Sequence, residues 1–272
     1  MTKFLRNILP AAMVFVIAAA PASRAQAVAT TNAGPPAAAN APSAPATAPA
    51  TLEILRLADA SRGNLAGVRW TVDIDAFENK EHQLRSMDVK ARGYDFLAEF
   101  LSPPKVKGQR VLFVERNMWY TKPGVKKPVP ISSRQKLVGN AAYGDIAATN
   151  YAEDYDATPL ADETVDGISC HVFDMKAKTK KSTYDRVKYW VSKDRTVAVK
   201  AEYYTVSGMM FKTARFEFGN KVQIENHERP FISAIKISDS VMKENLTSMS
   251  FSSPSLDKLS DSTFDVNLLM TR

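Results

Sequence analysis

Residues 184–219 read YDRVKYWVSKDRTVAVKAEYYTVSGMMFKTARFEFG and carry the clearest structural pattern in the chain. Runs rich in Val, Tyr, Phe and Trp are separated by Lys193-Asp194-Arg195 and by Ser207-Gly208. Polar and glycine-containing breaks of this kind are typical of tight turns between strands. The spacing predicts an antiparallel meander, with strands over 184–192, 196–205 and 209–219.

Similar runs on both sides extend this meander. Apolar and polar residues alternate in VRWTVDIDAF (68–77), which is the pattern of a half-buried strand. Only residues 52–62 have helical spacing, and residues 132–150 lose the alternation and look like a short helix or irregular loop. The chain is therefore mainly β, in a curved sheet or barrel. The other predicted strands cover 82–93, 94–101, 108–115, 118–123, 168–177, 231–239 and 246–253.

The N-terminal part has a different composition. Lys3 and Arg6 precede an apolar run, and Ala25-Gln26-Ala27 fits a cleavage site, so residues 1–27 read as a secretory signal peptide. Residues 28–51 are rich in Ala, Pro and Thr and carry no charge, which predicts a disordered tether. Residues 52–272 are then predicted to form one exported domain that is soluble after cleavage. Cys170 is its only cysteine, so the domain cannot form an internal disulfide.

Charge and motifs exclude several functional classes. Without Lys3, Arg6 and Arg24, 33 basic residues stand against 29 acidic ones, so the net charge is about +4 and predicts no nucleic-acid partner. The three histidines lack metal-ligand spacing, and the chain has no nucleophile elbow or phosphate-binding glycine loop. We expect no catalytic residue, no metal and no cofactor.

Two features leave alternatives open. The stretch GNAAYGDIAATNYAEDYD (139–156) brings together Asp145, Glu153, Asp154 and Asp156. These acids could bind a metal or catalyse a reaction, or they could be the solvated edge of an inserted plug or lid. The lysines of 122–127 and 176–181 could serve solubility, or could dock the protein on anionic lipid or on a partner.

Several strands are apolar on both faces, as in VLFV (111–114). Such strands need cover on both sides, from an internal helix or from a cavity that holds an apolar ligand. The residues expected to line this cavity follow strand alternation and the inserted segment. They are Tyr94, Phe96, Phe100, Val111, Phe113, Trp119, Leu137, Tyr143, Ile146, Phe173, Val187, Tyr189, Val199 and Tyr203.

The sequence resembles the periplasmic LolA-like family of outer-membrane lipoprotein-sorting proteins over most of residues 53–269. The matching landmarks are Lys107-Gly108, Asn117-Met118-Trp119, Pro130-Ile131, Gly144-Asp145, Asn150-Tyr151, Asp154-Tyr155, Glu163 to Gly167, and Cys170. The resemblance implies an incomplete antiparallel β-barrel of about 10–12 strands, wrapped around a few short helices and an apolar cavity. It implies no catalytic residues.

The resemblance also implies a function and partners. The function is to carry the acyl chains of a lipid or lipoprotein through the periplasm. An inner-membrane transporter of the resistance-nodulation-division type and an outer-membrane acceptor are the candidate protein partners. Two alternatives stay open: a non-catalytic envelope adaptor without a ligand, and an enzyme that uses Asp145, Asp154 or Asp156.

Overall fold

The computed structural model describes residues 47–147, 150–224 and 226–270. The predicted signal peptide, and the predicted tether up to residue 46, lie outside these residues. Helix α1 spans Ala48–Ala60 and begins inside the range predicted as tether, at Ala48 rather than Leu52. Pro49 lies in its first turn, where the missing N–H of proline costs no helical hydrogen bond.

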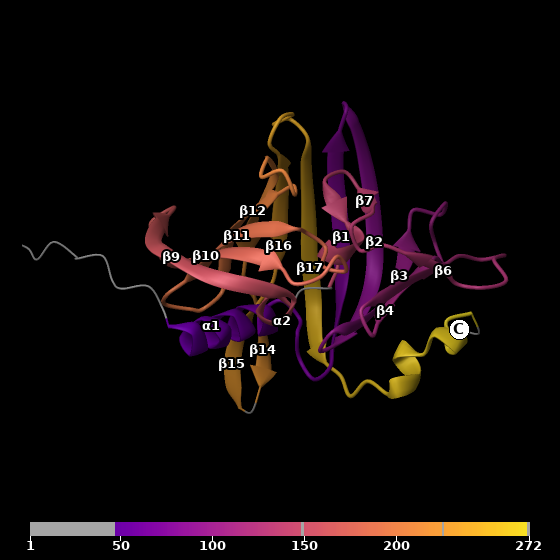
Figure 1. Ribbon diagram of the computed structural model, residues 1–272. Coiled ribbons are helices and arrows are strands. Elements are labelled where there is room, and N and C mark those ends of the chain that lie inside the picture. The colour runs from indigo at the N-terminus through magenta and orange to yellow at the C-terminus, as the bar shows by residue number, and fades with distance from the viewer. Residues whose placement is uncertain (1–46, 148–149, 225, 271–272) are drawn as a thin grey trace, which may run out of the picture. The chain divides into compact units, whose positions relative to one another are not determined.

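Thirteen strands form one antiparallel sheet in the order β6-β5-β4-β3-β2-β1-β17-β16-β13-β12-β11-β10-β9 (Figure 1). The first and last strands of the chain, β1 and β17, pair in its middle. Strands β6 and β9 each have one neighbour, so the sheet is an incomplete barrel, as predicted. The strands are β1 (Val68–Glu78), β2 (Glu81–Arg92), β3 (Asp95–Ser102), β4 (Arg110–Val114), β5 (Asn117–Thr121), β6 (Val129–Ile131), β9 (Tyr155–Val165), β10 (Ile168–Ala177), β11 (Arg186–Ser192), β12 (Ala198–Tyr204), β13 (Met210–Glu217), β16 (Ala234–Asp239) and β17 (Leu246–Leu256).

The two edge strands of the large sheet, β6 and β9, were not predicted, because they lack the alternating pattern of apolar and polar residues. Strand β9 contains Pro159 and several acids, which hide it in the sequence. An edge strand tolerates proline because one row of its N–H groups has no partner strand. Two further hairpins lie outside the large sheet: β7 (Lys136–Val138) with β8 (Ala141–Ala142), and β14 (Asn220–Ile224) with β15 (His227–Phe231).

The main apolar core lies on one face of the sheet, where alternate residues of β1 such as Trp70, Val72 and Ile74 are buried. Helix α1 lies there beside α2 (Tyr151–Asp154) and also contacts β11 (Figure 1). The segment that contains β7, β8 and the 3-10 turn η1 (Tyr143–Asp145) packs on the same core. We call residues 136–146 the inserted segment. Residues 132–150, predicted as short helix or irregular loop, therefore contain a small hairpin and one helical turn.

Two smaller apolar clusters outside the main core explain why several strands are apolar on both faces. The first contains Leu97 and Leu112, and the second contains Trp190. The C-terminal turns η2 (Asp261–Phe264) and η3 (Val266–Leu268) cover Leu97 and Leu112. Trp190 belongs to the second cluster, where Lys188 and Lys200 place their ammonium groups 4.6 and 4.4 Å from its ring centre. The outer apolar residues are thus covered by the chain's own segments and lysine stems.

Candidate functional site

The structure brings most of the predicted cavity residues into one apolar core. They are packed there rather than exposed to an open space: Phe96 and Phe113 stack at 5.7 Å, and Tyr189 meets Tyr151 edge-on at 4.9 Å. Leu137 and Tyr143 are half-buried and pack against this core. The nine buried members are Phe96, Phe100, Val111, Phe113, Ile146, Phe173, Val187, Tyr189 and Tyr203.

Three predicted residues lie elsewhere. Trp119 pairs with Leu112 and packs in the cluster under the C-terminal turns. Val199 lies in the Trp190 cluster because a β-bulge between β11 and β12 leaves it without a cross-strand partner and exchanges the faces locally. Tyr94 lies in the turn between β2 and β3, half-buried, with the Arg116 guanidinium 5.3 Å from its ring centre.

A buried cluster of Asp145, Lys212 and Tyr184 holds the inserted segment to the sheet. The Asp145 carboxylate accepts hydrogen bonds from the Tyr184 hydroxyl at 2.7 Å and from the Ala142 N–H at 2.8 Å. The Lys212 ammonium lies 3.0 Å from the same carboxylate, bonds to the Tyr184 hydroxyl, and donates to the Asn140 carbonyl at 2.9 Å. We call these three side chains the Asp145 cluster.

Burial shapes the electrostatics of this cluster. It lowers the pKa of the Lys212 ammonium, and the neighbouring Asp145 charge opposes that shift. It raises the pKa of Tyr184 well above its usual value, with Asp145 adding to the effect. The tyrosine therefore stays neutral and donates a hydrogen bond to the carboxylate, while the lysine supplies the balancing charge.

The expectation that the acids of 139–156 form a solvated edge is wrong for Asp145, which is buried. Lys212, 67 residues away in sequence, provides the buried cation that makes this burial tolerable. Asp154 is partly buried and paired with Arg116, and Glu153 is paired with Arg56 at 3.0 Å. Across the described residues no group of three or more His, Cys, Asp or Glu side chains is arranged to hold a metal ion.

A second buried cluster joins α1 to α2. Asp59 accepts a hydrogen bond from the Ala152 N–H at 2.9 Å, and its other carboxylate oxygen has no partner among the described residues. Burial raises the pKa of Asp59 to about 7. Arg62 is also buried, with its guanidinium 4.6 Å from the ring centre of Phe216 and 5.4 Å from that of Tyr151. We call Asp59 and Arg62 the Asp59 cluster.

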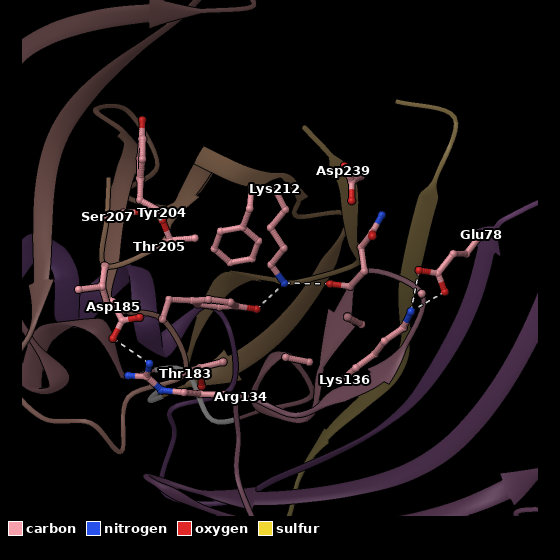
Figure 2. A pocket seen from close by; sticks show the side chains of 17 residues that line it. Glu78, Arg134, Lys136, Thr183, Asp185, Tyr204, Thr205, Ser207, Lys212 and Asp239 are labelled. Carbon is pink, nitrogen blue, oxygen red and sulfur yellow. Dashed lines mark hydrogen bonds and ion pairs between the residues drawn. The ribbon is translucent and has the colours of Figure 1, made fainter. Parts of the chain in front are cut away.

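A pocket of about 770 Å³ opens beside the Asp145 cluster (Figure 2). Ala141, Ala142 and Phe211 supply apolar wall, and Lys212 of the Asp145 cluster also lines the pocket. Ion pairs border it: Arg134 with Asp185 at 2.7 Å, and Lys136 with Glu78. The other lining residues are Gly139, Asn140, Thr183, Tyr184, Tyr204, Thr205, Val206, Ser207 and Asp239.

None of the predicted cavity residues lines this pocket. Lys212 is the residue that the sequence reasoning missed, although a signal was present. In MMFKTARFEF (209–218) Lys212 lies on the same face of the strand as Ala214 and Phe216, which are buried in the main core. A lysine on the apolar side of a strand needs a buried partner, and that requirement could have pointed to it.

None of the helices in the described part of the chain is long and apolar enough to cross a membrane. A search of curated proteins finds no match to this chain. Residues 93–271 match the model of a protein family described as an uncharacterized protein, and the chain belongs to this family.

Solved structures with the same fold are LolA-like. A LolA superfamily protein from Nitrosomonas europaea superimposes with a TM-score of 0.70 at 29% sequence identity, over 78% of this chain and 96% of that one. A domain described as an outer-membrane lipoprotein-sorting protein, from Vibrio parahaemolyticus, gives 0.68 at 22% identity over 80% and 97%. A protein from Desulfovibrio piger, of a family of unknown function, gives 0.67 at 21% over 81% and 98%. The predicted LolA-like fold is confirmed.

Proposed function

We propose that this LolA-like chain is a carrier that binds the acyl chains of a lipid or lipoprotein and shuttles them between components of a bacterial envelope. One observation carries the proposal. The apolar face of an unclosed sheet is filled by α1, α2 and the inserted segment rather than by a second sheet. Short segments of this kind can move aside for an apolar ligand at a lower cost than a sheet could.

The pocket of Figure 2 supports an entry route for such a ligand. Its volume of about 770 Å³ lies within the roughly 300–1,000 Å³ typical of small-molecule sites. Its wall at Ala141, Ala142 and Phe211 leads from solvent to residues that pack on the main core. The bordering charges are paired, which suits an uncharged chain better than a strongly charged ligand.

Binding of this kind needs no catalytic group. Burial of acyl chain contributes about 0.8 kcal/mol per methylene, so a long chain gains affinity from apolar contact alone. The ligand replaces contacts that α1 and the other covering segments make with the core, and release restores them. The exchange keeps apolar surface out of water in both states.

Two further parts of the proposal concern location and partners. The predicted signal peptide would place the mature chain in the periplasm, with residues 28–46 as a tether ahead of α1. An inner-membrane transporter of the resistance-nodulation-division type, or an outer-membrane acceptor, would supply or receive the ligand. Crosslinking in the producing cell tests these partners directly.

The decisive experiment is organic extraction and mass spectrometry of lipid bound to protein purified mildly from its own host. We expect co-purifying acyl lipid, and Phe211→Asp should reduce it at least tenfold because the charge would lie on the apolar wall. Val129→Asp, on the exposed edge strand β6, is the matched control and should keep the lipid. Circular dichroism confirms that both variants fold. Wild-type protein without lipid would refute the proposal.

The second candidate function is that of an envelope adaptor that binds no lipid. The close packing of the core favours it, since residues such as Phe96 and Phe173 are fully buried by the chain's own side chains. An adaptor predicts no extracted lipid and a stable protein partner on crosslinking. The same purification therefore separates the two functions.

A further inference from the structure

Two neighbouring hairpin connections expose large apolar side chains. Residues 205–209 join β12 to β13 and residues 240–245 join β16 to β17. Val206 is 87% exposed and Val241 81%, and Met209 and Met242 are exposed beside them. We call these two connections the apolar tips.

The apolar tips lie at the same end of the sheet. Strands β13 and β16 pair, with Lys212 opposite Asp239, and the Ser240 N–H donates to the Phe211 carbonyl at 3.0 Å. The chain leaves the sheet directly beyond this bond on both strands. Four exposed apolar side chains therefore gather on one edge of the molecule.

Local hydrogen bonds hold both tips in place. The Thr205 hydroxyl bonds to the Ser207 hydroxyl at 2.8 Å and accepts from the Met209 N–H at 3.2 Å. One carboxylate oxygen of Asp239 accepts from the N–H groups of Val241 and Met242 at 2.7 and 2.9 Å. The polar atoms of the tips are thus used internally, and the apolar side chains face solvent.

Several other hairpin connections of the described chain expose polar or charged residues at their turns. The β4–β5 turn consists of Glu115 and Arg116, the β9–β10 turn of Asp166 and Gly167, and the β11–β12 connection carries Lys193 to Arg195. Exposed turns gain nothing in stability from valine or methionine, and gathered apolar groups of this kind mark an interaction surface. The contrast singles out the apolar tips.

Positive charge lies beside the apolar tips. Lys176, Lys178 and Lys180 line a hollow of about 520 Å³ together with Val206 and Gly208. The two acids that also line it, Asp174 and Asp185, are paired with Arg186 and Arg134. Lys243 is exposed within the second tip, and Glu244 is the only acid in either tip. Apolar tips flanked by lysines match the two layers of an anionic membrane surface: acyl region below, phosphates above.

We propose that the apolar tips insert into the interface of a bilayer that contains anionic phospholipid, with the lysines of 176–180 on its phosphates. Val206 and Asp239 also line the pocket of Figure 2, so this orientation turns the mouth of the pocket toward the bilayer. Direct transfer of lipid at that mouth rests on the proposed function. Docking itself does not depend on what the pocket holds.

The test is co-sedimentation of the full chain with vesicles of phosphatidylcholine, with and without an equal share of phosphatidylglycerol. We expect binding to the anionic vesicles, and V206S/V241S should lower the partition coefficient at least about tenfold because two inserted side chains lose their apolar surface. Val129→Ser on the edge strand is the matched control and should bind as wild type. K176A/K180A should lower binding about tenfold on anionic vesicles and leave the weaker binding to neutral vesicles unchanged.

The outcomes separate this proposal from the carrier function. Wild-type protein that carries extracted lipid but does not bind vesicles refutes docking and leaves the carrier proposal standing. Vesicle binding without extracted lipid refutes the carrier proposal and leaves docking standing. Equal binding by V206S/V241S and wild type, or loss of a crosslinked protein partner in V206S/V241S without any vesicle binding, also refutes docking.

Discussion

The Asp145 cluster and the Asp59 cluster each tie an internal segment to the sheet, but only one is fully paired. The Asp145 carboxylate has a lysine, a hydroxyl and a backbone N–H around it. The Asp59 carboxylate uses one oxygen, and Arg62 keeps one guanidinium nitrogen without a hydrogen-bond partner among the described residues. The inserted segment is therefore anchored firmly, whereas α1 is held through the incompletely paired Asp59 carboxylate, which costs stability at neutral pH.

This difference bears on how an apolar ligand could enter. Unpaired buried polar atoms lower the free energy needed to separate α1 from the core, since those atoms regain water when they are exposed. The Asp145 cluster loses three good contacts if it opens. We expect α1 to yield before the inserted segment, and three substitutions test the comparison.

Lys212→Met should have the largest effect. It leaves the Asp145 charge buried without its cation, which typically costs about 3–5 kcal/mol. Urea denaturation followed by circular dichroism measures the loss. Lys243→Met, on an exposed tip, should change the free energy of unfolding by less than about 0.5 kcal/mol.

A loss below about 1 kcal/mol in Lys212→Met would mean that the Asp145 cluster is not an anchor. Adding Asp145→Leu to Lys212→Met removes the unpaired charge and should recover much of the loss. Failure of this recovery would place the effect in packing rather than in charge.

Asp59→Asn should have the next largest effect, and the sign depends on pH. Because the folded-state pKa is about 7 and the ordinary value is 3.8, the folded protein binds a proton that the unfolded chain releases. Stability from this group is full below about pH 4 and is lost as pH rises to about 7. Asparagine keeps the acceptor for Ala152 but does not ionise, so the variant should be more stable by about 4 kcal/mol at pH 8.

The measurement is the free energy of unfolding of wild type and Asp59→Asn between pH 4 and pH 8. The difference in the free energy of unfolding between the two proteins should grow across this range. Taking this difference cancels the contributions of all other titrating groups. A constant difference would show that Asp59 is not buried as an unpaired acid. Hydrogen exchange at pH 8 should also show slower opening of α1 in the variant.

Gly139→Ala should have the smallest of the three effects and tests the fit of the inserted segment. Gly139 has a φ of +53°, and an added Cβ would lie 2.4 Å from the Thr247 hydroxyl and 2.6 Å from the Ala76 Cβ. The clash and the backbone strain together should cost about 1–3 kcal/mol. Gly124 has a φ of +86° and open space around it, so Gly124→Ala isolates the strain.

Thermal unfolding compares these two glycine variants. Gly139→Ala should melt lower than Gly124→Ala by several degrees, because only the first displaces the segment from β1 and β17. Equal melting temperatures would mean that the segment shifts freely, and the contrast between the two clusters would then fail.

Much of the fold could be predicted because strand alternation is local. The runs at 68–77 and 184–192 became β1 and β11 with the expected pairing to near neighbours in sequence. Edge strand β9 could not be predicted in this way, since a strand with one neighbour tolerates Pro159 and exposed acids.

Less of the candidate site could be predicted. The alternation of residues along a strand placed Phe96 and Tyr189 on the face of the sheet that carries the main core, where they lie. It failed for Val199, where one β-bulge exchanged the two faces. Most of the pocket of Figure 2 is built from the ends of strands and from turns, where the alternation of apolar and polar residues carries little information. Its lining residues come from five separate parts of the chain.

By itself the sequence determined an antiparallel, mainly β chain and the large apolar residues that fill its core, because side chains of neighbouring residues along a strand alternate between its two faces. The tertiary structure alone decided that Asp145 meets Lys212, that the apolar tips lie at the same end of the sheet, and that a pocket opens beside the Asp145 cluster. Each of these depends on the register between strands distant in sequence, and the energy that fixes register is summed over the whole sheet.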